Sequence, residues 1–90
     1  MRITIKQLIW DEWNVGHIKK HCLSVKEIES AINYRVAQKK GYQGRIIIIG
    51  RSGKRLISVI LAKEEKQKYY VVTARDADKK EKQLVYEKEK

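Results

Sequence analysis

Residues 45–62 read RIIIIGRSGKRLISVILA, the densest apolar block of the chain, divided by one glycine-rich basic turn. Two runs rich in Ile and Val, each at least four residues long, are typical of β-strands that are apolar on both faces. Gly50 and Gly53 supply the backbone freedom that a turn requires. The stretch therefore predicts a buried β-hairpin, at one end of which the turn gathers the basic residues Arg51, Lys54 and Arg55.

Composition limits the chain to one domain and points to an anionic partner. Its 90 residues support a single core of modest depth, so residues 1–90 are expected to form one domain. A formal net charge of +10 favours nucleic acid, an acidic protein or an anionic membrane surface as partner. Asp and Glu are absent from Ser30 to Lys63, whereas eight Lys and Arg occur there. The basic field is therefore centred on the hairpin.

The compartment is predicted from cysteine usage and from the N-terminal residues. A single cysteine rules out an internal disulfide framework and suits a reducing cytosol. Met1 leads into Arg2-Ile3-Thr4-Ile5-Lys6 with no apolar segment of signal-peptide length, and no segment is long enough to span a bilayer. A cytoplasmic protein without membrane association is expected.

Before the hairpin, the sequence predicts a strand and two helices. Alternating apolar residues from Ile3 to Trp10 outline the strand. Asp11 is the expected N-cap of a first helix that ends near His21. Ser24 and Glu27 form a capping box inside a hydrophobic staple, and they open a second helix whose apolar spacing continues to Val36. Residues 38–44 then form a basic, glycine-containing loop.

After the hairpin, the sequence predicts one more strand and one more helix. Residues 63–68 form a solvated connection, and residues 69–75 are aromatic and β-branched, as in strands. Asp76 or Asp78 can cap a C-terminal helix over 78–90, whose last turns are too polar to be well anchored. The expected fold is α+β in the order β-α-α-β-β-β-α. It has a four-stranded, mainly antiparallel sheet with helices packed on one face and the other face partly open.

Two histidines of the first expected helix are candidates for proton transfer. His17 and His21 share a helix face with Trp13, and Lys20 lies beside them as a phosphate-binding cation. Cys22 adds a third metal-ligand type, but no second Cys or adjacent Glu completes a zinc motif, and the nearby cations would repel an ion. The simpler alternative is that these are ordinary surface residues of a helix.

Basic and aromatic residues form the second group of candidates. Arginine side chains at rigid strand ends can hold a phosphate without a large entropic cost, which singles out Arg51 and Arg75. Ordinary surface charge is the alternative, most of all for Lys54 and Arg55. Tyrosines can stack on unpaired bases, although in strands they more often pack half-buried. The candidates for RNA binding are Lys39, Lys40, Tyr42, Lys54 and Arg55.

Several short motifs occur in an order and spacing that resemble one known family. They are Trp10-Asp11, Asn14, His17, Lys20-His21, Ser24, Ile49-Gly50-Arg51-Ser52, Thr73-Ala74-Arg75-Asp76-Ala77 and Glu81. Together they resemble the BrnT-type toxins of type II toxin–antitoxin systems, which are similar in fold to the RelE superfamily of ribonucleases. The resemblance implies a RelE-like toxin that cleaves RNA. Cys22 stands where the family commonly has glycine, which weighs against a left-handed helix end there.

The resemblance also implies roles and partners. The catalytic candidates are His17, Lys20, His21, Arg51 and Arg75. The expected reaction is metal-independent attack of a 2′-hydroxyl on the neighbouring phosphate, without a cofactor. A cognate antitoxin is the expected protein partner, with a heterotetramer or larger complex as one arrangement. The alternatives are a nucleic-acid-binding module, such as a helix-turn-helix, and a partner-binding module, both without catalysis.

Overall fold

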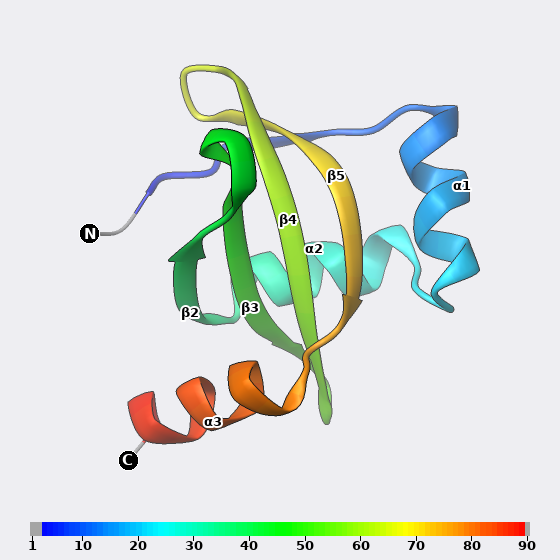
Figure 1. The fold of residues 1–90 in the computed structure, drawn as a ribbon. Coiled ribbons are helices and arrows are strands. Elements are labelled where there is room, and N and C mark those ends of the chain that lie inside the picture. Colours follow the sequence, from blue (N-terminus) through cyan, green and yellow to red (C-terminus); the bar gives the residue numbers. More distant parts are fainter. Residues whose placement is uncertain (1–2, 90) are drawn as a thin grey trace.

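The computed structural model describes residues 3–89 (Figure 1). Met1, Arg2 and Lys90 lie outside the described residues, so the expected domain and C-terminal helix are described without them. The helices and strands follow in the order β1 (Gln7–Ile9), α1 (Glu12–Lys20), α2 (Val25–Asn33), β2 (Arg35–Lys40), a short 3₁₀ turn (Tyr42–Gly44), β3 (Ile46–Ser52), β4 (Arg55–Glu65), β5 (Lys68–Asp76) and α3 (Lys79–Lys88). The general class is α+β, as predicted.

The predicted hairpin is present at the centre of the sheet. β3 and β4 pair antiparallel, with Ile48 opposite Val59, and Ile48 and Ile49 are both fully buried although they point to opposite faces. The expectation that Gly50 belongs to the turn was wrong. Gly50 lies inside β3, where a Cβ would come within 1.8 Å of the Ala31 carbonyl oxygen, so its function is to let α2 approach the sheet. Gly53, with φ +60°, lies at the turn.

The sheet has five strands in the order β1-β5-β4-β3-β2, one more than predicted. The extra strand is β2, because α2 ends at Asn33 and the chain turns back to pair with β3, with Ala37 opposite Ile49. The helix was expected to continue to Val36 because Val36 fits the apolar spacing of α2. One apolar residue cannot show whether the segment around it is helical or extended. Pairing of β1 with β5 is parallel, which makes the sheet mixed. Antiparallel pairing was expected because short connections favour antiparallel neighbours. The chain between β1 and β5 is long instead, and it contains α1, α2 and the other three strands.

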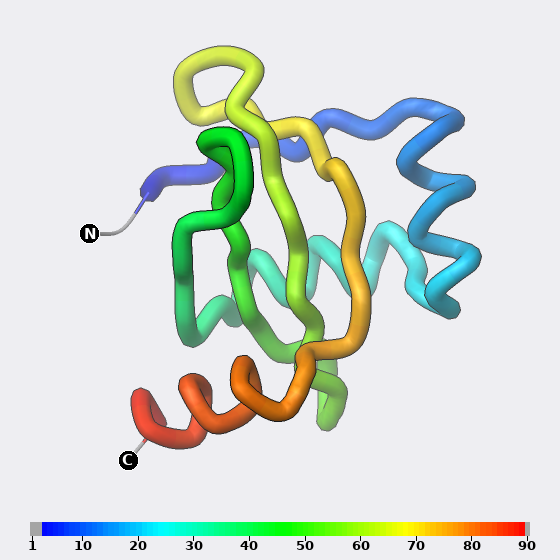
Figure 2. The backbone as a smooth tube through the Cα atoms, viewed as in Figure 1, coloured from blue at the N-terminus to red at the C-terminus, as the bar shows by residue number. Residues whose placement is uncertain are grey.

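The helices lie on two faces of the sheet, which corrects the prediction of one. α1 and α2 cover one face, where the core includes Ile18 and Ile28. α3 packs on the other face through Val85, beside Ala37, and Figure 2 shows it crossing the end of the sheet. Its apolar residues are few, so the sequence did not show which face it covers. Ile47 and Ile60 remain half-buried on this face, which is therefore covered only in part.

The predicted helix starts are confirmed. Asp11, Ser24 and Asp78 are the N-caps of α1, α2 and α3, and each forms a capping box with the residue three positions later. Within the described residues, no helix has the length and apolar character to cross a membrane.

The end of α1 is left-handed despite the missing glycine. Cys22 has φ +59°, and the amides of Cys22 and Leu23 donate to the carbonyls of Lys19 and Ile18. These two bonds form a Schellman motif, and Leu23 and Ile18 are buried together beneath it. Cys22 thus adopts the left-handed conformation at the point where the next residue, Leu23, is buried against Ile18.

Candidate nucleic-acid interface

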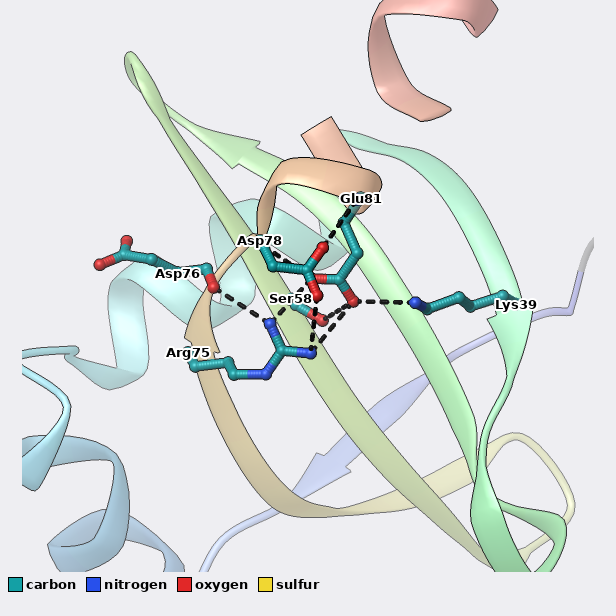
Figure 3. A network of polar contacts seen from close by, with 6 residues as sticks. All are labelled: Lys39, Ser58, Arg75, Asp76, Asp78 and Glu81. Carbon is teal, nitrogen blue, oxygen red and sulfur yellow. Dashed lines mark hydrogen bonds and ion pairs between the residues drawn. The ribbon is translucent and has the colours of Figure 1, made fainter. Parts of the chain in front are cut away.

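Arg75 belongs to an ionic network around a buried carboxylate, and this network joins α3 to the sheet (Figure 3). Its Nη1 and Nη2 atoms donate to the two carboxylate oxygens of Glu81, at 2.8 and 3.2 Å. Lys39 Nζ lies 3.2 Å from the same carboxylate, and the Ser58 hydroxyl donates to it at 3.1 Å. Glu81 is only 1% exposed, so its negative charge needs these donors. The network assigns Arg75 and Lys39 to positioning α3.

Two opposing effects act on the Glu81 carboxyl. Burial raises its pKa, because desolvation disfavours the charged form. Hydrogen bonds from Arg75, from the Asp78 backbone amide and from Lys39 outweigh burial and lower the pKa to about 2. The carboxylate is therefore ionised at neutral pH and holds its cationic partners in place.

Arg51 makes a different kind of ion pair, at the surface. Its Nε and Nη2 atoms donate to the two carboxylate oxygens of Glu89, at 2.9 and 2.6 Å. The exposed fractions of the two side chains are 34% and 36%. Hydrogen bonding to Glu89 raises the pKa of Arg51, against the smaller effect of burial. The last turn of α3 is thus joined to the end of β3.

Arg51 also lines a surface pocket of about 290 Å³ at the turn of the hairpin. Four of the lining side chains are cations and one is an acid; the lining residues are Arg51, Lys54, Arg55, Leu56, Asp76, Lys82 and Tyr86. The structure therefore confirms that the hairpin turn gathers Arg51, Lys54 and Arg55. Cations around an exposed tyrosine are the groups that bind a single-stranded nucleic acid, because they attract phosphates and stack on a base.

Arg55 connects this pocket to the junction of α1 and α2. Its guanidinium donates to Asp76 at 2.6 and 3.2 Å, to Glu27 at 3.0 Å and to the Cys22 carbonyl at 3.0 Å. Hydrogen bonding to Asp76 and Glu27 raises the pKa of Arg55 despite its partial burial, and the bond from Arg55 lowers the pKa of Asp76. Arg55 is a structural clamp as well as a wall of the pocket.

The two histidines of α1 contact each other and Trp13. The Trp13 and His17 rings stack at a centroid distance of 4.9 Å, and the His17 and His21 rings meet edge to face at 5.4 Å. Trp13 remains 60% exposed, so the ring group faces solvent. Lys20 is exposed on the same helix. The structure therefore brings together the two histidines that the sequence singled out.

The histidines and the two predicted catalytic arginines form separate groups. α1 packs on the face of the sheet that α2 covers, whereas Arg51 and Arg75 bind carboxylates of α3 on the other face. Among residues 3–89, no hydrogen bond or ion pair joins His17 or His21 to either arginine. Arg55 is the arginine that contacts the end of α1, since it donates to the carbonyl of Cys22, the residue after His21.

The remaining predicted RNA-binding residues lie at two ends of the sheet. Lys54 is exposed at the hairpin turn and lines the pocket. Lys40 and Tyr42 are exposed where β2 leads into β3, which is the opposite end of β3 from Arg51 (Figure 1). The structure therefore places Lys54 at the pocket, and Lys40 and Tyr42 away from it.

Lys82 and Glu89 were not predicted as part of a site, whereas Tyr86 is one of the tyrosines that the sequence offered for stacking on bases. Lys82 and Tyr86 line the pocket, and Glu89 binds Arg51. Lys82 and Tyr86 are four residues apart, and Glu89 follows three later, so all three share one helix face. That spacing was the available signal, but nothing local shows that this face meets the hairpin.

No model of a known protein family matches the chain, and no curated protein matches it. Among residues 3–89, no three His, Cys, Asp or Glu side chains are grouped to hold a metal ion.

Proposed function

We propose that the protein is an RNA endonuclease and the toxin component of a type II toxin–antitoxin system, acting in the cytoplasm. One observation carries the proposal: a pocket with four cations and a tyrosine lies at the hairpin turn, and its Arg51 already holds an oxyanion with both arms of its guanidinium. The resemblance of the motifs to BrnT-type toxins supports the same conclusion. A backbone phosphate of RNA is the natural ligand of such a fork.

The proposed reaction needs a base, an acid and cations. A base removes the proton of a 2′-hydroxyl, and the 2′-oxygen bonds to the adjacent phosphorus. The bond from phosphorus to the 5′-oxygen breaks, and an acid protonates the leaving oxygen. His17 and His21 are the candidates for base and acid, with Lys20 beside them, because imidazole exchanges protons near neutral pH. The histidines lie on the face of the sheet opposite Arg51, so we propose that Lys20 is the cation at the reacting phosphate and that Arg51 holds another phosphate of the same RNA strand.

The geometry modifies the proposed list of catalytic residues. Arg75 is occupied by buried Glu81, so we assign it to positioning rather than to catalysis. Arg55 is the arginine next to α1, since it contacts the Cys22 carbonyl, but Asp76 and Glu27 occupy its guanidinium, so we assign it to positioning as well. An RNA strand that lies along Arg55 would reach both the pocket and the end of α1.

The test is cleavage of RNA by the purified chain in the presence of EDTA. We expect products without added metal, and we expect His21→Ala and Arg51→Ala to remove most of the activity. Lys66→Ala is the matched control for Arg51→Ala, because it also removes one positive charge. Lys66 is exposed in the turn between β4 and β5. Circular dichroism would verify that each variant folds. Full activity of His21→Ala and Arg51→Ala would contradict the assignment.

A second function is favoured by the separation of the histidines from Arg51 and Arg75. In this alternative the chain binds nucleic acid or a protein partner without cleaving RNA. An acidic antitoxin segment would fit the positive charge, and the exposed edge of β2 offers backbone groups for an added strand. Binding of RNA without any product in the same assay would favour this alternative.

A further inference from the structure

We propose that Arg51, Lys54, Lys82 and Tyr86 form a site for one phosphate group, and that the Glu89 carboxylate closes this site until a phosphate displaces it. The identity of that phosphate as part of an RNA strand rests on the proposed function. The phosphate site itself rests on the contacts of the pocket. The C-terminal turn of α3 then controls access to the basic end of the hairpin.

The contact between Arg51 and Glu89 has the geometry of phosphate recognition. Two guanidinium nitrogens donate in parallel to two carboxylate oxygens, at 2.9 and 2.6 Å. Carboxylates and phosphates both accept this planar fork. Both side chains are about one-third exposed, so a ligand can approach from solvent. Glu89 thus occupies the position that a phosphate would take.

The pocket supplies further positive charge that Glu89 does not neutralise. Among residues 3–89, neither Lys54 nor Lys82 forms an ion pair within 4.0 Å, although both line the pocket with Arg51; Asp76, the acid in the same lining, pairs with Arg55, and Lys82 contributes to lowering its pKa. Tyr86 lines the same pocket and is 54% exposed. A phosphodiester carries the same single charge as Glu89, but its oxygens are tetrahedral and a nucleoside is attached to it, so it can reach these additional groups where a planar carboxylate cannot.

Glu89 is well suited to being displaced. It is the C-cap of α3, where the helix dipole is negative and disfavours a carboxylate. Exposed ion pairs contribute little to stability, and salt screens them. Glu81 is the contrast within the same helix, since it is buried and has three cationic or hydroxyl partners from the sheet. α3 is therefore held on the sheet by Glu81 and Val85, and Glu89 beyond them is free to exchange partners.

The experiment compares Glu89→Gln with Glu87→Gln. Both variants remove one negative charge from exposed positions near the end of α3, but only Glu89 binds Arg51. Fluorescence anisotropy would measure binding of a labelled 2′-O-methyl RNA, which lacks the attacking hydroxyl and so separates binding from cleavage. We expect Glu89→Gln to bind about threefold more tightly than Glu87→Gln. In an Arg51→Ala background this difference should vanish.

A second probe separates the phosphate site from the RNA function. Inorganic phosphate would be titrated while the Arg51 side-chain Nε–H signal is followed by NMR. A larger response in Glu89→Gln than in Glu87→Gln, without oligonucleotide binding, would support the phosphate site and contradict the RNA function. If the chain cleaves RNA but Glu89→Gln and Glu87→Gln bind the labelled RNA and inorganic phosphate equally well, the phosphate site is overturned. The proposed RNA function would then still stand. A difference that persists in Arg51→Ala would also overturn the site.

Discussion

Arg75 of β5 and Glu81 of α3 face each other with two hydrogen bonds, at 2.8 and 3.2 Å, and the carboxylate is 1% exposed. The pair joins the last strand to the helix that follows it, across the face that α1 and α2 leave free. Because the carboxylate is buried, its partners determine whether α3 can stay on the sheet. This relationship gives Arg75 a structural contact with α3, and the catalytic role that the sequence resemblance implies stays a prediction.

Arg75→Ala is expected to destabilise the protein by about 2 kcal/mol, because it leaves the buried Glu81 carboxylate without its main partner; Arg75 is itself 40% exposed, so the loss is smaller than for a fully buried pair. Arg51→Ala is the matched control, since it removes an arginine from a surface pair, whose contribution is typically about 1 kcal/mol or less. Urea unfolding followed by circular dichroism gives both values. Equal losses of stability in the two variants would contradict the structural role of Arg75.

Stability is expected to fall steeply in acid because of Glu81. Its pKa is lowered to about 2 in the folded protein, from 4.5 for the free side chain. A lowered pKa contributes stability above the unfolded value, and that contribution is lost as pH falls through the folded value. The difference corresponds to about 3 kcal/mol, lost between about pH 5 and pH 2.

Glu81→Gln tests this prediction, because glutamine cannot titrate there. The variant should be less stable than the parent at pH 7, and its stability should change less between pH 5 and pH 2. Urea unfolding at a series of pH values provides the comparison. An acid dependence identical in the two proteins would assign the transition to other groups.

Gly50→Ala should destabilise the protein by about 2 kcal/mol or more, because the added Cβ meets the Ala31 backbone and α2 must move away from the sheet. Gly16→Ala is the control, since Gly16 lies in α1 and a Cβ there has no neighbour within 4 Å. Alanine in a helix should stabilise by about 0.5–1 kcal/mol. Thermal unfolding of the two variants should therefore shift in opposite directions, and a tolerated Gly50→Ala would mean that α2 is not held closely against β3.

Cys22→Gly should raise the melting temperature. Cys22 has φ +59°, a conformation that glycine adopts without the Cβ penalty at a helix end. The expected gain is about 0.5–1 kcal/mol after allowing for the greater entropy of unfolded glycine. Cys22→Ala keeps a Cβ and serves as the control, with no comparable gain. Equal melting temperatures for the glycine and alanine variants would argue against a left-handed residue at this position.

The sequence by itself determined the features that depend on neighbouring residues. Asp11, Ser24 and Asp78 each cap a helix by contacts within three residues, and the Ile-rich runs on both sides of Gly53 form the central hairpin. Local hydrogen bonds and apolar runs leave a periodic pattern that is readable without a fold. For the same reason, the placing of Arg51, Lys54 and Arg55 at one turn followed from the hairpin alone.

Only the tertiary structure decided which distant segments meet. β1 pairs with β5 across the whole domain, β2 adds a strand where the apolar spacing suited a helix, and α3 packs on the face opposite α2. The ion pairs that join α3 to the sheet connect residues far apart in sequence, such as Arg51 with Glu89 and Lys39 with Glu81. Such pairs leave no local pattern, because their energy depends on burial and on the approach of charges that only the folded chain brings together.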